Sequence, residues 1–276
     1  MNVHDSTIEN IYFDLTLEAI LKRYGYDFRQ YAQLSLKRRI SEFIKNESLV
    51  DFSQLIDKIL TDEKYFEKFL FQVNVNVSEM FRDPIFFVRL REKVIPLLRT
   101  YPSISIWHAG CSTGEEAYSL AILLKEENLL ERAKIYATDI NAVSIDFAKR
   151  GIYTLDKIKQ YTQNYLKFNG KSDFSDYYHV KYGCAVINTS LRERINFVKH
   201  NLISDPMLRK FNLIFCRNVL IYFNKNLQNQ VLDLLTDNLK HYAYLCLGMK
   251  ENLCSMNVED RFEVIDSKAK IYKKND

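Results

Sequence analysis

Glycine and proline are scarce in this chain of 276 residues, which has seven glycines and four prolines. Average usage, about 7% glycine and about 5% proline, would supply roughly 19 and roughly 14 in a chain of this length. The shortage excludes collagen-like and linker-rich architectures, and it disfavours an all-β fold that is dense in turns. The few glycines that are present therefore mark positions worth locating.

Several other features are missing. The five cysteines are odd in number, widely spaced and without a CxxC pair, so neither a disulfide framework nor a zinc site is expected. The five histidines show no paired spacing typical of metal ligands. No stretch approaches about 18 apolar residues, and Met1–Asn10 is acidic and polar where a secretory signal needs a basic start and an apolar run. These absences predict a soluble, cytoplasmic protein that does not insert into a membrane.

Charge of one sign is not in large excess either. The 39 Lys and Arg residues against 35 Asp and Glu residues give a formal net charge of +4, which is too mild to indicate a nucleic-acid partner. The hydrophobic fraction of 47% and the charged fraction of 27% match globular averages. The chain can therefore bury a sizeable core.

The first third of the chain has a helical pattern. Apolar residues recur at helical spacing from Ile11 to about Val73, which predicts an all-helical domain over residues 1–75. Asp83 and Pro84 then fit an N-cap and a first helical position, opening a helix that ends near Pro96. We expect residues 76–100 to form a linker and connecting helix that contributes to the site.

From residue 101 onward, strand and helix patterns alternate, which predicts an α/β fold with a mostly parallel, doubly wound sheet over residues 101–276. Residues 152–194 interrupt the alternation and are expected to form a small inserted subdomain. Helices are expected at residues 115–128, 141–150 and 225–239. The predicted strands are Ile104–Ala109, Lys134–Thr138, Ile195–Val198, Leu213–Cys216 and Tyr244–Leu247, with a closing antiparallel pair at Phe262–Ile265 and Lys270–Tyr272.

The turn after the first predicted strand, Gly110–Gly114, is the first place to look for a ligand, because ligands bind at the carboxyl ends of strands in open α/β sheets. Its two glycines fit neither GxGxxG nor a phosphate-binding GxxxxGK[ST] loop, so a triphosphate is disfavoured. By itself the segment is either a tight turn or a binding loop. Asp139, at the end of the second strand, suits ribose hydroxyls or the start of the next helix. Loop and acid together indicate a nucleoside-bearing cofactor.

Two further side chains allow two interpretations each. Cys216 follows a predicted strand, but no histidine lies near it in the sequence, so a buried structural cysteine is favoured over a nucleophile. Arg82 lies in a polar segment before the connecting helix and faces either a site or solvent.

Three segments of the chain follow known sequence patterns. They are Asn76–Arg82, close to Asn-x-Thr-x-Phe-Phe-Arg, Ser112–Ser119, close to Ser-Thr-Gly-Glu-Glu-Pro-Tyr-Ser, and Ile214–Phe223, which matches Ile-Phe-Cys-Arg-Asn-Val-x-Ile-Tyr-Phe. In these segments the chain resembles the CheR-type chemotaxis protein methyltransferases, and the resemblance spans nearly the whole chain.

The resemblance implies a class I AdoMet-dependent methyltransferase fold, which is Rossmann-like, with an N-terminal all-helical domain. It also implies transfer of a methyl group from S-adenosylmethionine to glutamate side chains of methyl-accepting chemotaxis receptors, leaving S-adenosylhomocysteine, with no metal.

The resemblance also assigns residues to roles. Arg82 and Tyr222 would be the catalytic residues beside the transferred methyl. The residues of the cofactor site would be Asn76, Ser78, Arg82, Gly110, Glu116, Asp139, Asn201, Leu202, Arg217 and Asn218.

The same resemblance places receptor contacts in the helical domain. Lys37, Arg38 and Arg39 form a basic cluster there that suits an acidic receptor helix, although a solvated helix face is the alternative. The expected partner is the cytoplasmic domain of a chemoreceptor, and the protein is expected to act as a monomer.

The chain departs from the family pattern at a few positions. Ser78 replaces threonine and keeps the hydroxyl, Met80 replaces phenylalanine, and Ala117 replaces proline. In Gly248–Asn252, Lys250 replaces a serine. Two alternatives therefore stay open: a methyltransferase for another carboxylate substrate, and an AdoMet-binding signalling module without catalysis, which only Lys250 favours.

Overall fold

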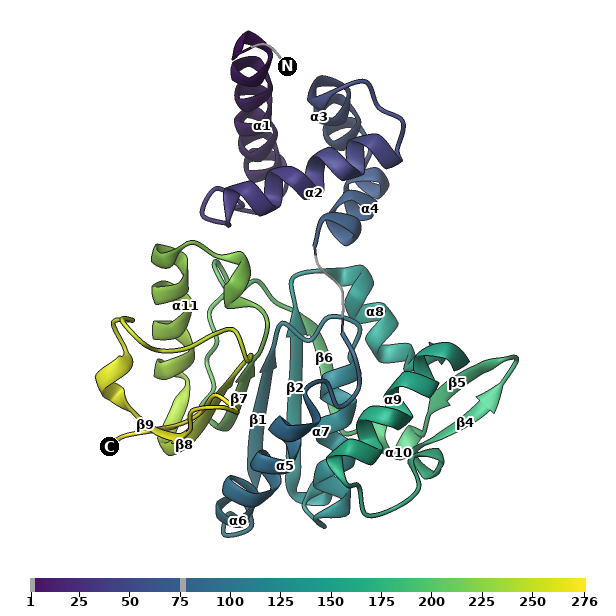
Figure 1. The fold of residues 1–276 in the computed structure, drawn as a ribbon, viewed down its shortest axis with the longest axis vertical. Coiled ribbons are helices and arrows are strands. Elements are labelled where there is room, and N and C mark those ends of the chain that lie inside the picture. The colour runs from purple at the N-terminus through teal and green to yellow at the C-terminus, as the bar shows by residue number, and fades with distance from the viewer. Residues whose placement is uncertain (1–2, 75–77) are drawn as a thin grey trace. The chain divides into compact units, whose positions relative to one another are not determined.

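The computed structural model describes residues 3–74 and 78–276, and by their internal contacts they divide into two units (Figure 1). Among the described residues, the helical unit comprises 3–74 together with the short segment 221–228. The sheet unit comprises residues 78–220 and 229–276.

Helices make up most of residues 3–74, in agreement with the predicted all-helical domain. Two of them begin at aspartate N-caps, because Asp51 accepts hydrogen bonds from the backbone of Ser53 and Gln54, and Asp62 does the same for Lys64 and Tyr65. Its core contains Leu17, Ile20, Ile40, Leu55 and Ile59, all at most 2% exposed. The helices are α1 (Val3–Tyr24), α2 (Gln33–Asn46), α3 (Phe52–Thr61) and α4 (Glu63–Val73).

The segment 221–228 joins the helical unit through backbone pairing. Tyr31 and Phe223 form an isolated antiparallel bridge, and the backbone N–H of Ala32 donates to the carbonyl of Tyr222 over 2.8 Å. The backbone N–H of Asn224 donates to the carbonyl of Gln30, also over 2.8 Å. Tyr222 is therefore held by a segment between α1 and α2.

The sheet unit is built on a seven-stranded sheet of order β6-β2-β1-β7-β8-β10-β9. The first five in this order are parallel, whereas β10 is antiparallel to both β8 and β9, as the closing pair was predicted to be. The strands are β1 (Ile104–Ala109), β2 (Ala133–Asp139), β6 (Ile195–Lys199), β7 (Phe211–Cys216), β8 (Leu239–Leu247), β9 (Phe262–Asp266) and β10 (Ile271–Lys274). The chain leaves β1 toward β2 and β6 and returns to β7, so the strand order reverses beside β1, where open α/β sheets bind ligands.

The helices of this unit follow the predictions closely. Asn141 caps α8 by accepting from the backbone of Val143 and Ser144, and Gly151 ends that helix with a φ of 60°. The α-helices that lie wholly in this unit are α5 (Pro84–Lys93), α6 (Ile95–Leu98), α7 (Glu115–Glu126) and α8 (Ala142–Arg150), with 3-10 turns at η1 (Leu130–Arg132) and η4 (Glu259–Arg261). The turn η3 (Leu220–Tyr222) and helix α11 (Lys225–Asp237) each have residues in both units.

One helix start differs from its prediction. Helix α5 begins at Pro84 as expected, but Asp83 does not cap it, because Asp83 has a φ of 56° and its side chain makes no capping bond. The Asp83 carboxylate instead pairs with Arg217. The helix ends at Lys93, and Pro96 lies in the short helix α6.

Residues 152–194 form a small structure of their own beside the main sheet. Three strands pair antiparallel in the order β3-β5-β4. The elements are β3 (Ile152–Thr154), α9 (Leu155–Phe168), η2 (Phe174–Tyr177), β4 (Tyr178–Lys181), β5 (Cys184–Ile187) and α10 (Thr189–Arg192).

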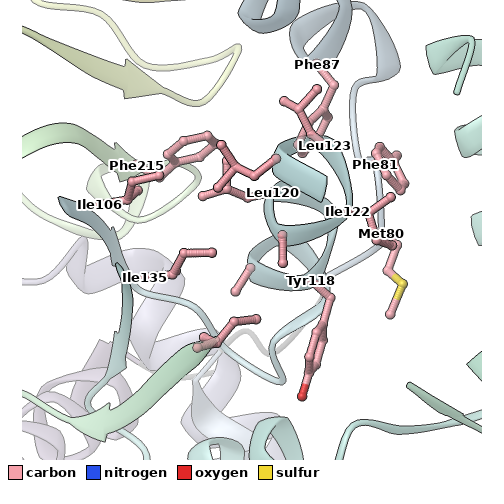
Figure 2. Packing of buried hydrophobic residues seen from close by; sticks show 14 of the residues in the cluster. Met80, Phe81, Phe87, Ile106, Tyr118, Leu120, Ile122, Leu123, Ile135 and Phe215 are labelled. Atoms are coloured by element: carbon pink, nitrogen blue, oxygen red, sulfur yellow. The ribbon is translucent and has the colours of Figure 1, made fainter. Parts of the chain in front are cut away.

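Helix α7 lies at the centre of the sheet unit's hydrophobic core (Figure 2). Its Leu120 and Leu123 pack with Ile106, Ile135 and Phe215 of the sheet, and all five are fully buried. Burial of such aliphatic and aromatic side chains contributes roughly 1.5–3 kcal/mol each. The core thereby fixes the first turn of α7 at the carboxyl edge of the sheet.

Removing the cap of α8 tests this local structure. Asn141→Ala deletes the acceptor for two backbone N–H groups, so we expect a loss of about 1 kcal/mol in the free energy of unfolding. Urea denaturation followed by circular dichroism measures the loss. Asn141→Asp, which keeps the acceptor, should retain most of the stability, and an equal loss in both variants would contradict the capping role.

Candidate functional site

Four parallel strands of the sheet unit deliver polar segments to one edge. The carboxyl ends of β1, β2, β7 and β8 lie side by side, because residues near these ends pair in register: Ala109 with Thr138, His108 with Phe215, and Cys216 with Leu247. The segments that follow these strands begin at Gly110, Ile140, Arg217 and Gly248. The predicted convergence of the loop, Asp139 and the Arg217–Asn218 pair is therefore present.

The loop Gly110–Gly114 is tied to the end of β2. The backbone N–H groups of Gly110 and Cys111 donate to the carbonyl of Thr138 over 2.8 and 2.9 Å. Gly110 and Gly114 have φ values of +76° and +91°, which favour glycine. A Cβ at Gly110 would lie 2.4 Å from Cγ2 of Val219, so the close approach at this glycine is to a neighbouring loop of the same chain.

Asp139 holds both the loop and the next helix. Its Oδ2 accepts from the backbone N–H of Ser112 over 2.8 Å, and its Oδ1 accepts from that of Asn141 over 2.9 Å. Burial raises the pKa of this carboxyl. Asp139 is partly exposed, and a carboxylate has about four acceptor positions, so further donors such as ribose hydroxyls fit here.

Two buried polar atoms beside Asp139 fit a polar ligand. The Ser112 hydroxyl oxygen and the Asn141 amide nitrogen have no hydrogen-bond partner among the described residues. Unpartnered buried polar groups are costly, and a ligand is one way to satisfy them. The residues at this edge therefore fit a nucleoside-bearing group.

Arg217 forms the centre of a buried ion network. Its Nη2 lies 2.8 Å from Oδ2 of Asp83, and its Nη1 pairs with Oε1 of Glu116. The Nε of Arg217 donates to the carbonyl of Leu247 over 3.3 Å. The guanidinium also lies over the Phe86 ring, 3.9 Å from its centroid. Arg217 is only 3% exposed, so these contacts take the place of water.

Glu116 is fully engaged in the same network. Its second oxygen, Oε2, lies 2.9 Å from Nε2 of His108. Burial by itself would raise the pKa of Glu116, but Arg217 and His108 together lower it to about 2. The resemblance assigns Glu116 and Arg217 to the cofactor pocket, and their charged groups here first satisfy each other.

Glu251 organises the neighbouring loop. Its Oε2 accepts from the backbone N–H groups of Asn218 and Gly248 over 2.9 and 2.6 Å, and its Oε1 accepts from that of Val219 over 2.9 Å. Asn218 has a φ of 60°, and this carboxylate stabilises that conformation. No role for Glu251 was predicted from the sequence, because in that segment only the serine-to-lysine departure at Lys250 was considered. The available signal was an acid three residues after Gly248, the glycine that directly follows a predicted strand.

The other described residues assigned to the cofactor pocket are more exposed than Glu116 and Arg217. Ser78, Arg82, Asn201 and Leu202 are partly exposed. The backbone before Arg82 is anchored, because the N–H of Phe81 donates to the Ser119 hydroxyl over 2.7 Å. Asn76 lies outside the described residues.

Thiol and metal chemistry find no support at this edge. Burial raises the pKa of Cys216 and Cys111 well above its ordinary value, so both thiols are inert. No group of three His, Cys, Asp or Glu residues in the described chain could hold a metal ion. No helix within residues 3–74 and 78–276 is long and apolar enough to cross a membrane.

In the helical unit, the structure separates the basic cluster of α2. Lys37 lies 3.4 Å from Glu9 Oε1, Arg38 is exposed, and Arg39 is partly buried. Arg39 donates to the carbonyl of Val73 over 2.5 Å, and its guanidinium lies 5.3 Å from the centroid of the Tyr222 ring. Arg39 and Tyr222, which the resemblance assigns to receptor contact and to catalysis, are therefore neighbours.

Two family models match the chain. The model described as CheR methyltransferase, SAM binding domain, matches residues 76–271. The model described as CheR methyltransferase, all-alpha domain, matches residues 12–71.

Three relatives match this chain over most of both lengths. A protein of Pseudomonas putida named "Putative methyltransferase Cher3" is 46% identical, covering 95% of this chain and 96% of that protein. The chemotaxis protein methyltransferase of Borreliella burgdorferi is 29% identical over 86% of both chains. Chemotaxis protein methyltransferase 1 of Vibrio cholerae is 30% identical, covering 87% of this chain and 86% of that protein.

The ion network predicts a pH-dependent stability. Because the native pKa of Glu116 is about 2, below the ordinary 4.5, its ionised form stabilises the fold above the unfolded pKa, and this contribution is lost as the pH falls toward 2. Glu116→Gln should cost about 3–5 kcal/mol near neutral pH.

Urea denaturation of both proteins from about pH 6 to about pH 3 measures this difference, which should shrink below about pH 5. Glu67→Gln, at an exposed glutamate, is the matched control and should change little at any pH. A difference that stays constant with pH would contradict the network.

Proposed function

Because the chain belongs to the CheR methyltransferase family, whose cofactor is S-adenosylmethionine, we propose that it methylates glutamate side chains of methyl-accepting chemotaxis receptors. The products are glutamyl methyl esters and S-adenosylhomocysteine, and the reaction serves chemotaxis adaptation. The observation that carries this proposal is the polar edge around Asp139 and Arg217, which lies inside the segment that matches the SAM binding domain.

The chemistry agrees with the residues that are present. When bound, the cofactor supplies an electrophilic methyl group to the substrate carboxylate. A glutamate with a pKa of about 4.3 is already ionised at neutral pH, so the nucleophile needs no general base. The protein's contribution is then to hold the reacting atoms in line at roughly 3 Å, and anchored loops suit that task.

In this proposal, the cofactor-site residues divide between direct contact and support. Asp139 accepts from the ribose hydroxyls, while the loop at Gly110, the Asn201–Leu202 pair and Asn218 line the pocket, together with Ser78. Glu116 and Arg217 support this pocket from below, because their ion pair holds both side chains in place.

Arg82 and Tyr222 are the proposed catalytic residues. Arg82 orients the substrate carboxylate, or the cofactor edge beside it, through its planar N–H donors. Tyr222 packs and hydrogen-bonds near the methyl group. The contacts of Tyr222 with Ala32 and Arg39 support a fixed ring, because they hold its backbone and its face.

The helical unit is the proposed receptor-binding part. Exposed Arg38 and partly exposed Lys37 suit an acidic receptor helix, whereas Arg39 acts through its position against Tyr222. We also propose a cytoplasmic monomer whose partner is the receptor's cytoplasmic domain. Lys250, the departure that favoured a module without catalysis, is exposed, so it leaves the buried contacts of the site intact.

A methyl-transfer assay tests the reaction. Incubation with methyl-labelled S-adenosylmethionine and a chemoreceptor cytoplasmic fragment should label the fragment, and mild alkali should release the label as methanol. Label that resists alkali, or that appears only on another acceptor, would favour a methyltransferase with a different substrate. Cofactor binding without any label would favour a module without catalysis.

Two substitutions test the catalytic assignment. Arg82→Ala and Tyr222→Phe should each lower kcat at least about tenfold, because each removes a group that positions the reacting atoms. Calorimetric titration with S-adenosylhomocysteine should show that Tyr222→Phe still binds the product. Wild-type rates in both variants would contradict the assignment.

Charge reversal tests receptor binding. Arg38→Glu should raise KM for the receptor fragment several-fold and leave the affinity for S-adenosylhomocysteine unchanged, because Arg38 is exposed on α2. Arg23→Glu, at an exposed arginine on α1, is the matched control. An unchanged KM for Arg38→Glu would refute the role of α2.

A further inference from the structure

The inserted subdomain, residues 152–194, contacts the loop Gly110–Gly114 directly. Tyr153 on β3 is only 4% exposed, and its hydroxyl donates to the backbone carbonyl of Thr113 over 2.8 Å. Thr113 lies between Ser112, which is bonded to Asp139, and Gly114, which precedes α7. One tyrosine of the subdomain therefore fixes the middle of this loop.

A second contact ties helix α9 to the first residue of α7. Glu115 is fully buried, and its Oε1 accepts from the Tyr161 hydroxyl over 3.1 Å and lies 3.3 Å from Nζ of Lys157. Its Oε2 accepts from the Thr113 hydroxyl over 2.6 Å. A buried carboxylate needs such partners, and two of the three come from α9. The loop and the start of α7 are thus held from the side of the subdomain.

Helix α9 also holds the segment that leads to Arg82. The Asn164 amide donates to the carbonyl of Met80 over 3.0 Å and to Oε2 of Glu79 over 3.2 Å. Phe168 stacks on the ring of Phe81 with centroids 4.8 Å apart. The same helix therefore contacts both Glu115, directly after the loop Gly110–Gly114, and the segment directly before Arg82.

We propose that Tyr153 and Tyr161 are positioning residues, through which the inserted subdomain sets the affinity of the site for S-adenosylmethionine. Their hydroxyls act on the ligand only through Thr113 and Glu115, which they hold. This inference rests on the proposed placement of the cofactor at the loop Gly110–Gly114. In this inference the subdomain shapes the cofactor site without touching the cofactor itself.

The double variant Tyr153→Phe/Tyr161→Phe tests the inference, because it deletes two hydroxyls and keeps both rings in the core. Calorimetric titration of the full chain with S-adenosylhomocysteine should show a Kd raised about fivefold or more, since losing a buried hydrogen bond leaves its partner unsatisfied. Melting temperatures are measured in parallel.

Tyr177→Phe is the matched control. Tyr177 belongs to the same subdomain, is 3% exposed and donates to Oε1 of Glu126 over 3.0 Å, at the far end of α7. It should lose stability and keep the wild-type Kd. A merely structural role for Tyr153 and Tyr161 would give the same result for the double variant as for this control.

The outcomes separate the inference from the proposed function. If the wild type binds S-adenosylhomocysteine and the double variant binds it equally well, the inference is wrong and the proposed cofactor site stands. If the wild type does not bind it, both are wrong. Should the double variant fail to fold, the two single variants decide: a Kd raised at least about twofold in either supports the inference, and wild-type values in both overturn it.

Discussion

The buried guanidinium of Arg217 is the contact on which the rest of the sheet unit's functional edge depends. It joins the residue before α5, the first turn of α7 and the end of β8, through Asp83, Glu116 and Leu247. A buried arginine without such partners would be strongly destabilising, so the network and the positions of these segments require each other. Asp83 therefore pairs with Arg217 and makes no capping hydrogen bond to α5.

Carboxylates that accept backbone N–H groups extend the same principle around the edge. Asp139 holds the loop after β1, and Glu251 holds the loop after β7. Glu115 and the tyrosines of the inserted subdomain hold that first loop from the other side. Each loop is thereby fixed before any ligand arrives, which lowers the ordering cost of binding.

Most of the fold could be predicted from the sequence, because local patterns determine it. The strand Ile104–Ala109 has the predicted bounds, and Asn141 and Gly151 cap α8 as predicted. The two C-terminal strands pair antiparallel, also as predicted. The match to the SAM binding domain confirms the methyltransferase fold. The roles of Glu251, Tyr153 and Asp83 could not be read from local patterns, since each depends on a partner far away in the sequence. Separation of the Lys37–Arg39 cluster likewise depends on tertiary contacts with Glu9 and Tyr222.

A crystal structure of the chain with S-adenosylhomocysteine tests the central claim most directly, that the cofactor binds on the edge fixed by Arg217. The account predicts ribose hydroxyls on Asp139, the ligand beside the loop Gly110–Gly114, and an unbroken contact between Arg217 and Glu116 beneath it. A ligand bound elsewhere, or one that displaces Glu116 from Arg217, would contradict the account.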